Sequence, residues 1–523
     1  MSRLTKRFPI SAMTKPETIN HTGFPAYIPS DDQALAELMF VGTFGNTFYA
    51  TGQHWTDAFT HVVKKMVAQD PEFVAKAAVK AREEGFVRSA PLVALMALIS
   101  GSPRAQAWGR RVFGRIIRTG DDLRNVVALA QSKQFRDGYG GLARRLVADW
   151  LNTHLDEYQA IKYAGKGERL SLRNILRLTH PVPPSPEREA IYRWLVKGTL
   201  TPEVDLPQIT WLDRLSRGEV DPVSAIESGR LPFEAVMPRI EKADKAVWSA
   251  LLRHAPYMFL LRSISAFNRA GVWDNDESLD YAVKVLADPN RIHKAMQFPF
   301  RYYQAAQVLE RERIVQPLIN ALYDALEISL SNLPDLGRLR VAIAPDVSGS
   351  MHGTQVAEHT SAAVIAGIFT GAIWKAAANA VVLPFGTQVV ALSGVSPRDS
   401  VMTISRAVGQ LNGGGTDLSV PIRALNHSGK IIDLFIGLTD SEDWAASGGW
   451  HGEGFLAAWR HYQKIAPQAQ AVLIQLVPSG TRVAPSKDPS VHYVYGWSDS
   501  VLRYIGYVIQ GQSLVDSIRS MEF

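Results

Sequence analysis

From about residue 56 to residue 331, apolar residues recur at helical spacing in one short segment after another. Apolar side chains three and four positions apart lie on one face of a helix, so this pattern predicts amphipathic helices. Turn-like links such as Gly101-Ser102-Pro103 separate most segments, and no run alternates like a strand. The expected helices include residues 34–40, 59–68, 71–84, 90–99, 105–118, 123–131, 141–153, 156–164, 172–178, 186–197, 231–240, 246–254 and 315–329.

Helices joined by short links pack as antiparallel pairs, because each buries its apolar face against a neighbour. We therefore expect an all-α region of stacked pairs, an α-solenoid with HEAT-like or armadillo-like repeats. At roughly 40–47 residues per pair, this region would hold about six or seven repeats. No sharp repeat motif marks them in the sequence.

The pattern changes after residue 338 to short apolar runs that alternate with helical segments. Such alternation predicts an α/β domain whose parallel sheet is covered on both faces. The boundary falls near SNLPDLG at residues 331–337, so we assign residues 1–30 to an N-terminal arm, 31–334 to the helical region and 335–523 to the α/β domain. The expected strands are 339–344, 380–384, 388–392, 432–438, 471–477 and 492–495, and the expected helices are 354–378, 399–411, 418–426, 454–465 and 498–510.

The positive charge of the chain is unevenly distributed. Residues 1–340 carry 45 basic against 37 acidic side chains, whereas residues 341–523 carry 11 against 13. Residues 101–200 alone hold 18 basic and 9 acidic side chains, which is the footprint expected of a surface that binds a polyanion. A solvated helix surface rich in arginine is the alternative.

The composition favours a cytoplasmic protein. The first twenty residues are basic but lack the apolar segment of a secretory signal, and the most apolar stretch, residues 91–100, is too short to span a membrane. The absence of cysteine rules out disulfides and thiolate metal sites. We expect a monomer with no membrane partner.

Three loops carry the most specific chemistry. In VAIAPDVSGSM at residues 341–351, a buried-strand pattern ends in Asp346, Ser348 and Ser350. The turn GGGTD brings Thr416, and a second apolar run, IIDLFIGLTD, ends in Asp440. Loops at the carboxyl ends of parallel strands meet in one crevice, and hard oxygen ligands suit Mg²⁺, with Mn²⁺ or Ca²⁺ as alternatives. The structural alternative is that Asp346 and the hydroxyls only bond the backbone of the turn.

In their order and separation these loops resemble the metal-ion-dependent adhesion site of von Willebrand factor A (vWA) domains. The resemblance implies that two serines and a threonine ligate the ion, with the acids binding directly or through water. By position these ligands are Asp346, Ser348, Ser350, Thr416 and Asp440. One departure is Ser441-Glu442, where many adhesion-type domains have glycine.

Further stretches resemble the Ro ribonucleoproteins, whose helical part is called the TROVE module. They are LMFVGTFGNTFY and its flanks, GLARRLVADWLN, IKYAGKGERLSLRNILRLTHP and RIHKAMQFPFRYYQA. The resemblance implies a ring of HEAT-like repeats closed by the vWA domain. It further implies binding of small structured Y RNAs on the basic outer surface, passage of single-stranded 3′ ends of misfolded or immature RNA through the ring, and cooperation with an exoribonuclease.

Candidate RNA contacts follow from charge and from this resemblance. The family match places an RNA-binding histidine at His180 and a basic position at Lys162, although His180 before Pro181 also suits a residue that caps helix carbonyls. Arg111, Arg115 and Arg118 are spaced to share one helix face. The nearby aromatic residues, including Trp108, suit base stacking or a place in the core. The remaining candidates are Lys166, Arg169, Arg173, Arg177, Arg144, Arg145, Arg291, His293 and Lys294.

The sequence holds no Ser-His-Asp set, no phosphate-loop lysine motif and too few clustered acids for a two-metal nuclease. We therefore expect a non-catalytic RNA-binding scaffold. The alternative is a metal-dependent protein-interaction module in which the helical region is only a platform. A third possibility, an ancillary subunit of a metal chelatase or ATPase, leaves the helical half without a role.

Overall fold

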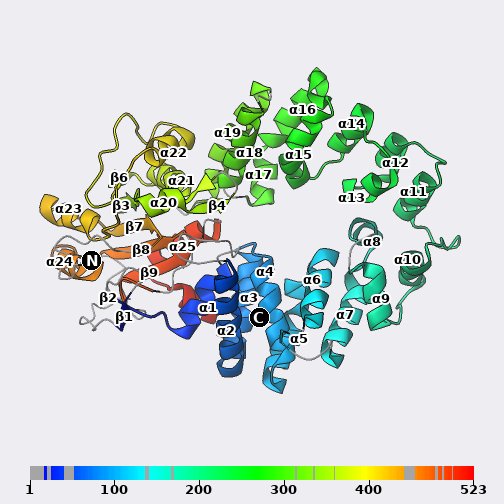
Figure 1. The fold of residues 1–523 in the computed structure, drawn as a ribbon, viewed down its shortest axis with the longest axis horizontal. Helices are drawn as coiled ribbons and strands as arrows, with labels where there is room; N and C mark the ends of the chain where they lie inside the picture. Colours follow the sequence, from blue (N-terminus) through cyan, green and yellow to red (C-terminus); the bar gives the residue numbers. More distant parts are fainter. Residues whose placement is uncertain are drawn as a thin grey trace.

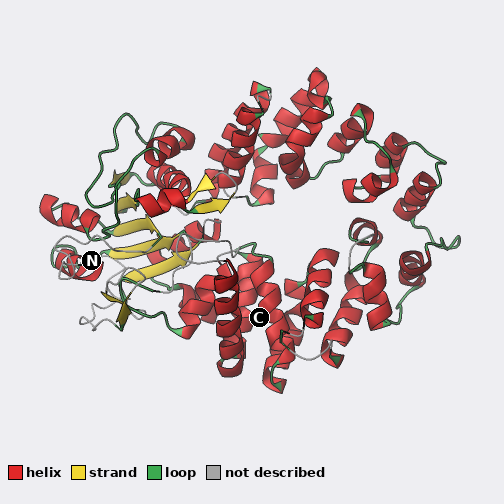
Figure 2. Ribbon diagram, in the orientation of Figure 1, coloured by secondary structure: helices red, strands yellow, loops and turns green. Residues whose placement is uncertain are grey.

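In the computed structural model, an array of helices curves round until both its ends contact a unit built on a parallel sheet (Figure 1). Figure 2 shows that helices make up the array, whereas the main sheet lies at the left of the view. The predicted fold class, a helical repeat region followed by an α/β domain with a parallel sheet, is confirmed. The structure describes residues 17–19, 25–40, 52–132, 134–135, 140–165, 170–297, 299–312, 315–333, 336–357, 360–440, 454–476, 481–485, 488–496 and 499–523.

The helices of the array follow one another in sequence and in space (Figure 1). They are α1 (Asp31–Phe40), α2 (Gly52–Gln69), α3 (Pro71–Glu83), α4 (Ser89–Ser100), α5 (Pro103–Ile116), α6 (Gly120–Gln131), α7 (Gly141–His154), α8 (Glu157–Lys162), α9 (Leu172–Thr179), α10 (Pro186–Lys197), α11 (Pro207–Ser216), α12 (Pro222–Gly229), α13 (Phe233–Val236), α14 (Lys245–Arg253), α15 (Tyr257–Arg269), α16 (Asp276–Leu286), α17 (Pro289–Ala295), α18 (Pro299–Arg311) and α19 (Gln316–Ser329), with short 3₁₀ turns η1 (Met237–Arg239), η2 (Val272–Asp274) and η3 (Leu330–Asn332).

Local capping chemistry sets many of the helix starts. A short polar residue followed by proline begins five of these helices, where the side-chain oxygen accepts an amide of the first turn and proline needs no donor. The capping residues are Asp70, Ser102, Ser185, Asp221 and Asp288. The turn-like links seen in the sequence are therefore helix boundaries.

One expected helix is interrupted. Residues 231–240 form only the short helix α13 and the 3₁₀ turn η1. Pro238 lies inside that turn, and a proline has no N–H with which to continue an α-helical ladder.

The described residues of the second unit form a five-stranded sheet in the order β6-β3-β7-β8-β9, with every neighbouring pair parallel. Each face of the sheet packs in a separate cluster of buried apolar residues. Ile343 belongs to the larger cluster, and its neighbour Ala344, on the other face, belongs to a smaller one. Helices therefore cover both faces, as predicted. The strands are β3 (Arg340–Pro345), β6 (Asn379–Val382), β7 (Leu434–Thr439), β8 (Gln470–Gln475) and β9 (Val491–Tyr495), and the helices are α20 (Gly349–Gly353), α21 (Ala362–Ala376), α22 (Val401–Gly409), α23 (Val420–Ser428), α24 (Phe455–Tyr462), α25 (Asp499–Ile509) and α26 (Leu514–Arg519).

Two predictions in this unit are wrong. The helix expected at residues 354–378 begins only at Ala362, after the hairpin β4 (Gln355–Ala357) and β5 (Thr360–Ser361), where β-branched residues favour extended backbone. The strand expected at residues 388–392 is reduced to one bridge between Phe385 and Val389, because a tight turn at Gly386 reverses the chain.

The array contacts the α/β unit at both ends. At one end α1 packs on β9 and α26, and α26 also packs on α3. At the other, α18 contacts α21 and α19 contacts α22. Ahead of α1, β1 (Thr18–Ile19) pairs with β2 (Pro25–Ala26), and Tyr27 exchanges two backbone hydrogen bonds of 2.9 Å with Arg482. Within the described part of the chain, no helix is both long and apolar enough to cross a membrane.

Candidate functional site

The two acids of the candidate ligand set follow neighbouring strands. Because β3 and β7 are adjacent and parallel, Asp346 and Asp440 emerge at the same edge of the sheet. The Asp346 amide donates to the carbonyl of Leu438 over 2.9 Å, which fixes the start of one loop against the end of the other strand. Both acids are almost completely buried.

The Asp346 carboxylate organises the first loop. It accepts the Ser348 amide at 2.9 Å and the Thr439 hydroxyl at 2.8 Å, while the hydroxyls of Ser348 and Ser350 lie 3.2 Å apart. Burial raises the pKa of Asp346 to about 7, and the negative charge of Asp440 is the second largest cause of this increase. Two carboxylates are thus held close together out of water, which is unfavourable unless a cation or a proton lies between them.

Glycines bring the second metal loop, GGGTD at residues 413–417, into contact with the first. The Gly413 amide donates to the Val347 carbonyl and the Gly349 amide to the Gly414 carbonyl, both over 2.8 Å. A side chain at Gly386 would collide with the Gly413 carbonyl, so this close approach requires glycine. The loop places Thr416 in the interior, where its hydroxyl has no hydrogen-bond partner among the described residues.

An ion pair between the buried Asp417 and the partly exposed Arg423 supports the Thr416 loop, and it was not anticipated from the sequence. Asp417 accepts the Ser419 amide at 2.9 Å and pairs with Arg423, whose Nη2 lies 2.9 Å from its Oδ2. These contacts join the loop to the first turn of α23. Six positions separate Asp417 from Arg423, a spacing that no helix or strand period would have singled out.

The donor set fits a hard divalent cation. It offers carboxylate and hydroxyl oxygens, one of them an unsatisfied buried hydroxyl at Thr416. The described residues contain no group of three or more His, Cys, Asp or Glu side chains arranged to hold a metal, so serine and threonine would have to supply part of the ligand set. The unusual Ser441-Glu442 pair lies outside the described residues.

The second group of candidates lies along α7 and α9. Arg173 and Arg177 are exposed one turn apart on α9, and Arg145 is exposed on α7. The Arg144 Nε donates to the Thr179 carbonyl over 3.1 Å, which brings α7 and the end of α9 together. We name Arg144, Arg145, Arg173, Arg177 and His180 the α7–α9 basic surface.

His180 ends α9 in the left-handed conformation, with φ 46°. Its backbone amide, at 2.9 Å from the Leu176 carbonyl, makes the capping bond, and its side chain is exposed. The ring is therefore not needed as the cap.

At the end of α8, Lys162 is half-buried, donates to the Tyr158 hydroxyl at 3.2 Å and lies over the Tyr163 ring. Burial lowers the pKa of Lys162, but the contacts with Tyr158 and Tyr163 outweigh it and raise the pKa overall. Lys166 and Arg169 lie outside the described residues.

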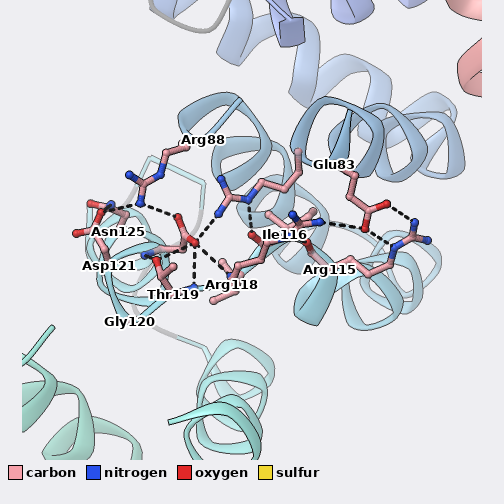
Figure 3. Close-up of polar contacts among 12 residues, drawn as sticks. Glu83, Arg88, Arg115, Ile116, Arg118, Thr119, Gly120, Asp121 and Asn125 are labelled. Atoms are coloured by element: carbon pink, nitrogen blue, oxygen red, sulfur yellow. Dashed lines mark hydrogen bonds and ion pairs between the residues drawn. The ribbon is translucent and has the colours of Figure 1, made fainter. Parts of the chain in front are cut away.

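Arg115 of α5 and Arg118, which follows the end of this helix, form ion pairs within the protein (Figure 3). Arg115 binds both carboxylate oxygens of Glu83, at 3.0 and 2.7 Å, and Arg118 lies 3.3 Å from the same carboxylate. The hydrogen bond from Arg115 is the largest cause that lowers the pKa of Glu83. The expectation that Arg118 shares a helix face with Arg111 is wrong, because α5 ends at Ile116 and residue 117 is extended.

Around Arg118, further ion pairs connect α3, the start of α4 and α6 (Figure 3). The buried Arg82 Nη2 lies 2.6 Å from Asp122 Oδ2 and its Nε donates to the Ile116 carbonyl. Asp122 also closes a capping box with Thr119, and Arg88 pairs with Asp121. This network is structural, since most of its charge is already compensated.

The last three candidate RNA contacts lie away from the α7–α9 basic surface. Arg291, His293 and Lys294 belong to α17, which is on the opposite arm of the array from α9 (Figure 1). Arg291 lies 3.7 Å from Asp288, and the His293 ring is 3.4 Å from the Ser331 hydroxyl. Lys294 is exposed. The structure thus does not bring these residues into the α7–α9 basic surface.

Comparison with known proteins gives two domain matches. Residues 234–336 match the TROVE domain and residues 340–508 match the Ro60 vWA domain. The chain is 26% identical over 453 residues to the RNA-binding protein RO60 of Deinococcus radiodurans, covering 82% of this chain and 83% of that protein. The crystal structure of the Deinococcus radiodurans RO (RSR) protein shares the fold, with a TM-score of 0.71, 22% identity and coverage of 90% of this chain and 99% of that one.

Proposed function

The chain belongs to the Ro family, and from this we propose that it is a non-catalytic, RNA-binding scaffold of the Ro type. The curated relative is named an RNA-binding protein. The surface chemistry of this chain is suited to the same task.

One observation carries the proposal. Arg145, Arg173 and Arg177 are exposed and form no ion pair with any described residue, whereas Arg115 and Arg118 share an ion pair with the Glu83 carboxylate. Arginines with free guanidinium groups on neighbouring helices are suited to bind phosphates and to release counterions from RNA. We assign this surface to a small structured RNA of the Y type. Single-stranded 3′ ends of misfolded or immature RNA would enter the ring, and the protein would aid their quality control or maturation together with an exoribonuclease.

In the vWA domain, Asp346, Ser348, Ser350, Thr416 and Asp440 would hold one divalent cation, with Mg²⁺ as the first candidate. A bound cation would compensate the two buried carboxylates and attract a carboxylate or phosphate oxygen from a partner. Asp346 would keep both serine hydroxyls of its loop oriented.

The test of RNA binding is charge reversal on the α7–α9 basic surface. The variant Arg173→Glu/Arg177→Glu should bind a structured small RNA at least about tenfold more weakly and show a shallower dependence of affinity on salt. The matched control is Arg398→Glu/Lys430→Glu, which changes the net charge equally at two exposed positions of the vWA domain. Equal affinities and salt slopes in all three proteins would exclude this surface.

The second candidate function is that of a metal-dependent protein-interaction module. It rests on the convergence of the three metal loops. This second function predicts that the purified chain carries a partner protein and no nucleic acid, and that EDTA releases this partner. Copurified RNA that survives EDTA would favour the first proposal.

A further inference from the structure

We propose that Phe523 is a removable cover over a base-stacking site that Trp108 and Arg111 form on α5. This inference rests on the proposed RNA-binding function and names one site for it. The ligand would be an unpaired nucleobase of single-stranded RNA. The site is separate from the α7–α9 basic surface, which binds phosphates.

The geometry of the Phe523 ring points to this role. Its centroid lies 5.3 Å from that of Trp108, with the planes tilted by 52°. The guanidinium carbon of Arg111 lies 5.2 Å from each of these two rings, and that of Arg115 lies 5.2 Å from Phe523. Arg111 Nη2 also donates to the backbone oxygen of Phe523 over 3.2 Å.

This arrangement of a flat ring among an indole and two guanidinium groups is also how proteins hold an unstacked base. An aromatic side chain and a nucleobase both present a π face to a cation, so they compete for the same position. Arg104 and Arg110 are exposed on the same helix and form no ion pair with the described part of the chain. They are available for the phosphates on either side of a bound base.

The cover is attached in a way that allows it to leave. Helix α26 ends at Arg519, and its anchors lie within the helix: Leu514 and Ile518 are buried, and Arg519 pairs with Asp70 and Asp32 at 3.0 and 3.2 Å. Phe523 lies beyond these anchors, at the edge of the larger cluster of buried apolar residues, where it stays partly exposed and contacts partly or fully exposed side chains of α5. Displacing residues 521–523 would therefore leave α26 in place on α3.

Opening the cover should strengthen binding of single strands only. In the full-length protein, Phe523→Ala should bind an oligoadenylate of about twelve nucleotides roughly three- to tenfold more tightly than the wild type. An abasic oligonucleotide of equal length and charge should bind both proteins equally, because it has no base to stack. Phe523→Trp, which keeps an aromatic cover, should bind like the wild type.

Two double variants locate the gain. Adding Trp108→Ala to Phe523→Ala should return the affinity to the wild-type value, and adding Arg111→Ser should do the same without disturbing the partly buried indole. Thermal melting of each variant checks that the fold is retained.

The outcomes separate this inference from the proposed function. If Phe523→Ala binds oligoadenylate no better than the wild type while structured RNA still binds, the cover is refuted and the scaffold function stands. A gain that persists in both double variants refutes the Trp108–Arg111 site. If no RNA binds any of these proteins, the proposed function fails and this inference fails with it.

Discussion

Glu37 of α1 and Arg482 of the vWA domain, 445 positions apart, form an ion pair in which their side chains are only 5% and 1% exposed. Arg482 also donates to Gln475 over 3.0 Å and lies over the Tyr493 ring. Two charges that have lost their water are stable there only as a pair. This contact therefore fixes the beginning of the helical array to the sheet domain.

The first prediction concerns this pair. Glu37→Ala should lower the free energy of unfolding by about 3–5 kcal/mol, because it leaves a guanidinium group buried without its carboxylate. Urea denaturation provides the measurement. The control is Asp31→Ala, which removes the exposed Lys65–Asp31 pair and should cost at most about 1 kcal/mol. Similar losses in the two variants would show that burial does not set the strength of the Glu37 contact.

The second prediction concerns metal binding. Mg²⁺ should raise the melting temperature of the wild type, since a ligand that binds only the folded state stabilises it, and should leave Asp346→Asn and Thr416→Val unaffected. Without metal, Asp346→Asn should melt above the wild type, because it removes one of two buried carboxylates that repel each other. Thr370→Val, which removes a buried hydroxyl that donates to the Ala366 carbonyl of its own helix α21, should retain the response to Mg²⁺. A wild type that does not respond to Mg²⁺, Mn²⁺ or Ca²⁺ would exclude the site.

The third prediction separates positioning from ligation. Arg423→Leu should weaken Mg²⁺ affinity by roughly tenfold, because Asp417 loses the partner that helps hold the Thr416 loop. Titration calorimetry measures the affinity, and melting without metal checks the fold. Arg406→Leu, which breaks the ion pair of α22 with Glu310 on α18, should bind Mg²⁺ normally. If both variants bind alike, the Asp417–Arg423 pair has no part in shaping the site.

The fourth prediction is a pH dependence. Burial lowers the pKa of His492 to about 4, against the smaller opposing effect of the Asp516 charge, and its Nε2 lies 2.9 Å from the Gln470 side-chain oxygen. The unfolded chain takes up a proton below about pH 6.5, whereas the folded chain does so only near pH 4. Stability should therefore fall by up to about 3 kcal/mol as the pH drops through this interval, with no contribution from His492 above it.

His492→Gln should remove this part of the acid sensitivity, as measured by urea denaturation at several pH values between 7 and 4. The exposed His461, changed to Gln, is the control and should keep the wild-type profile. Parallel profiles for all three proteins would contradict the assignment to His492.

The helices of this protein could be predicted from the sequence where apolar spacing and capping residues set their position. Helical spacing, together with caps such as Asp70-Pro71, acts within a few residues, so most helices appeared at nearly their observed positions. Hairpin β4–β5 was missed because the apolar pattern of residues 354–378 suits a helix as well, and only contacts with the rest of the domain select the extended form. Helix α26 was missed too, since its six residues carry little periodic information.

The sequence by itself determined the two-part architecture, the order of the metal loops and the location of the positive charge, because each depends on residue type and local spacing. The tertiary structure alone decided which charges remain available. Glu83 pairs with both Arg115 and Arg118, and Phe523 packs on Trp108 across more than four hundred residues, whereas Arg173 and Arg177 stay exposed. Such pairings depend on which helices the chain brings together, and a local pattern holds no record of contacts between distant segments.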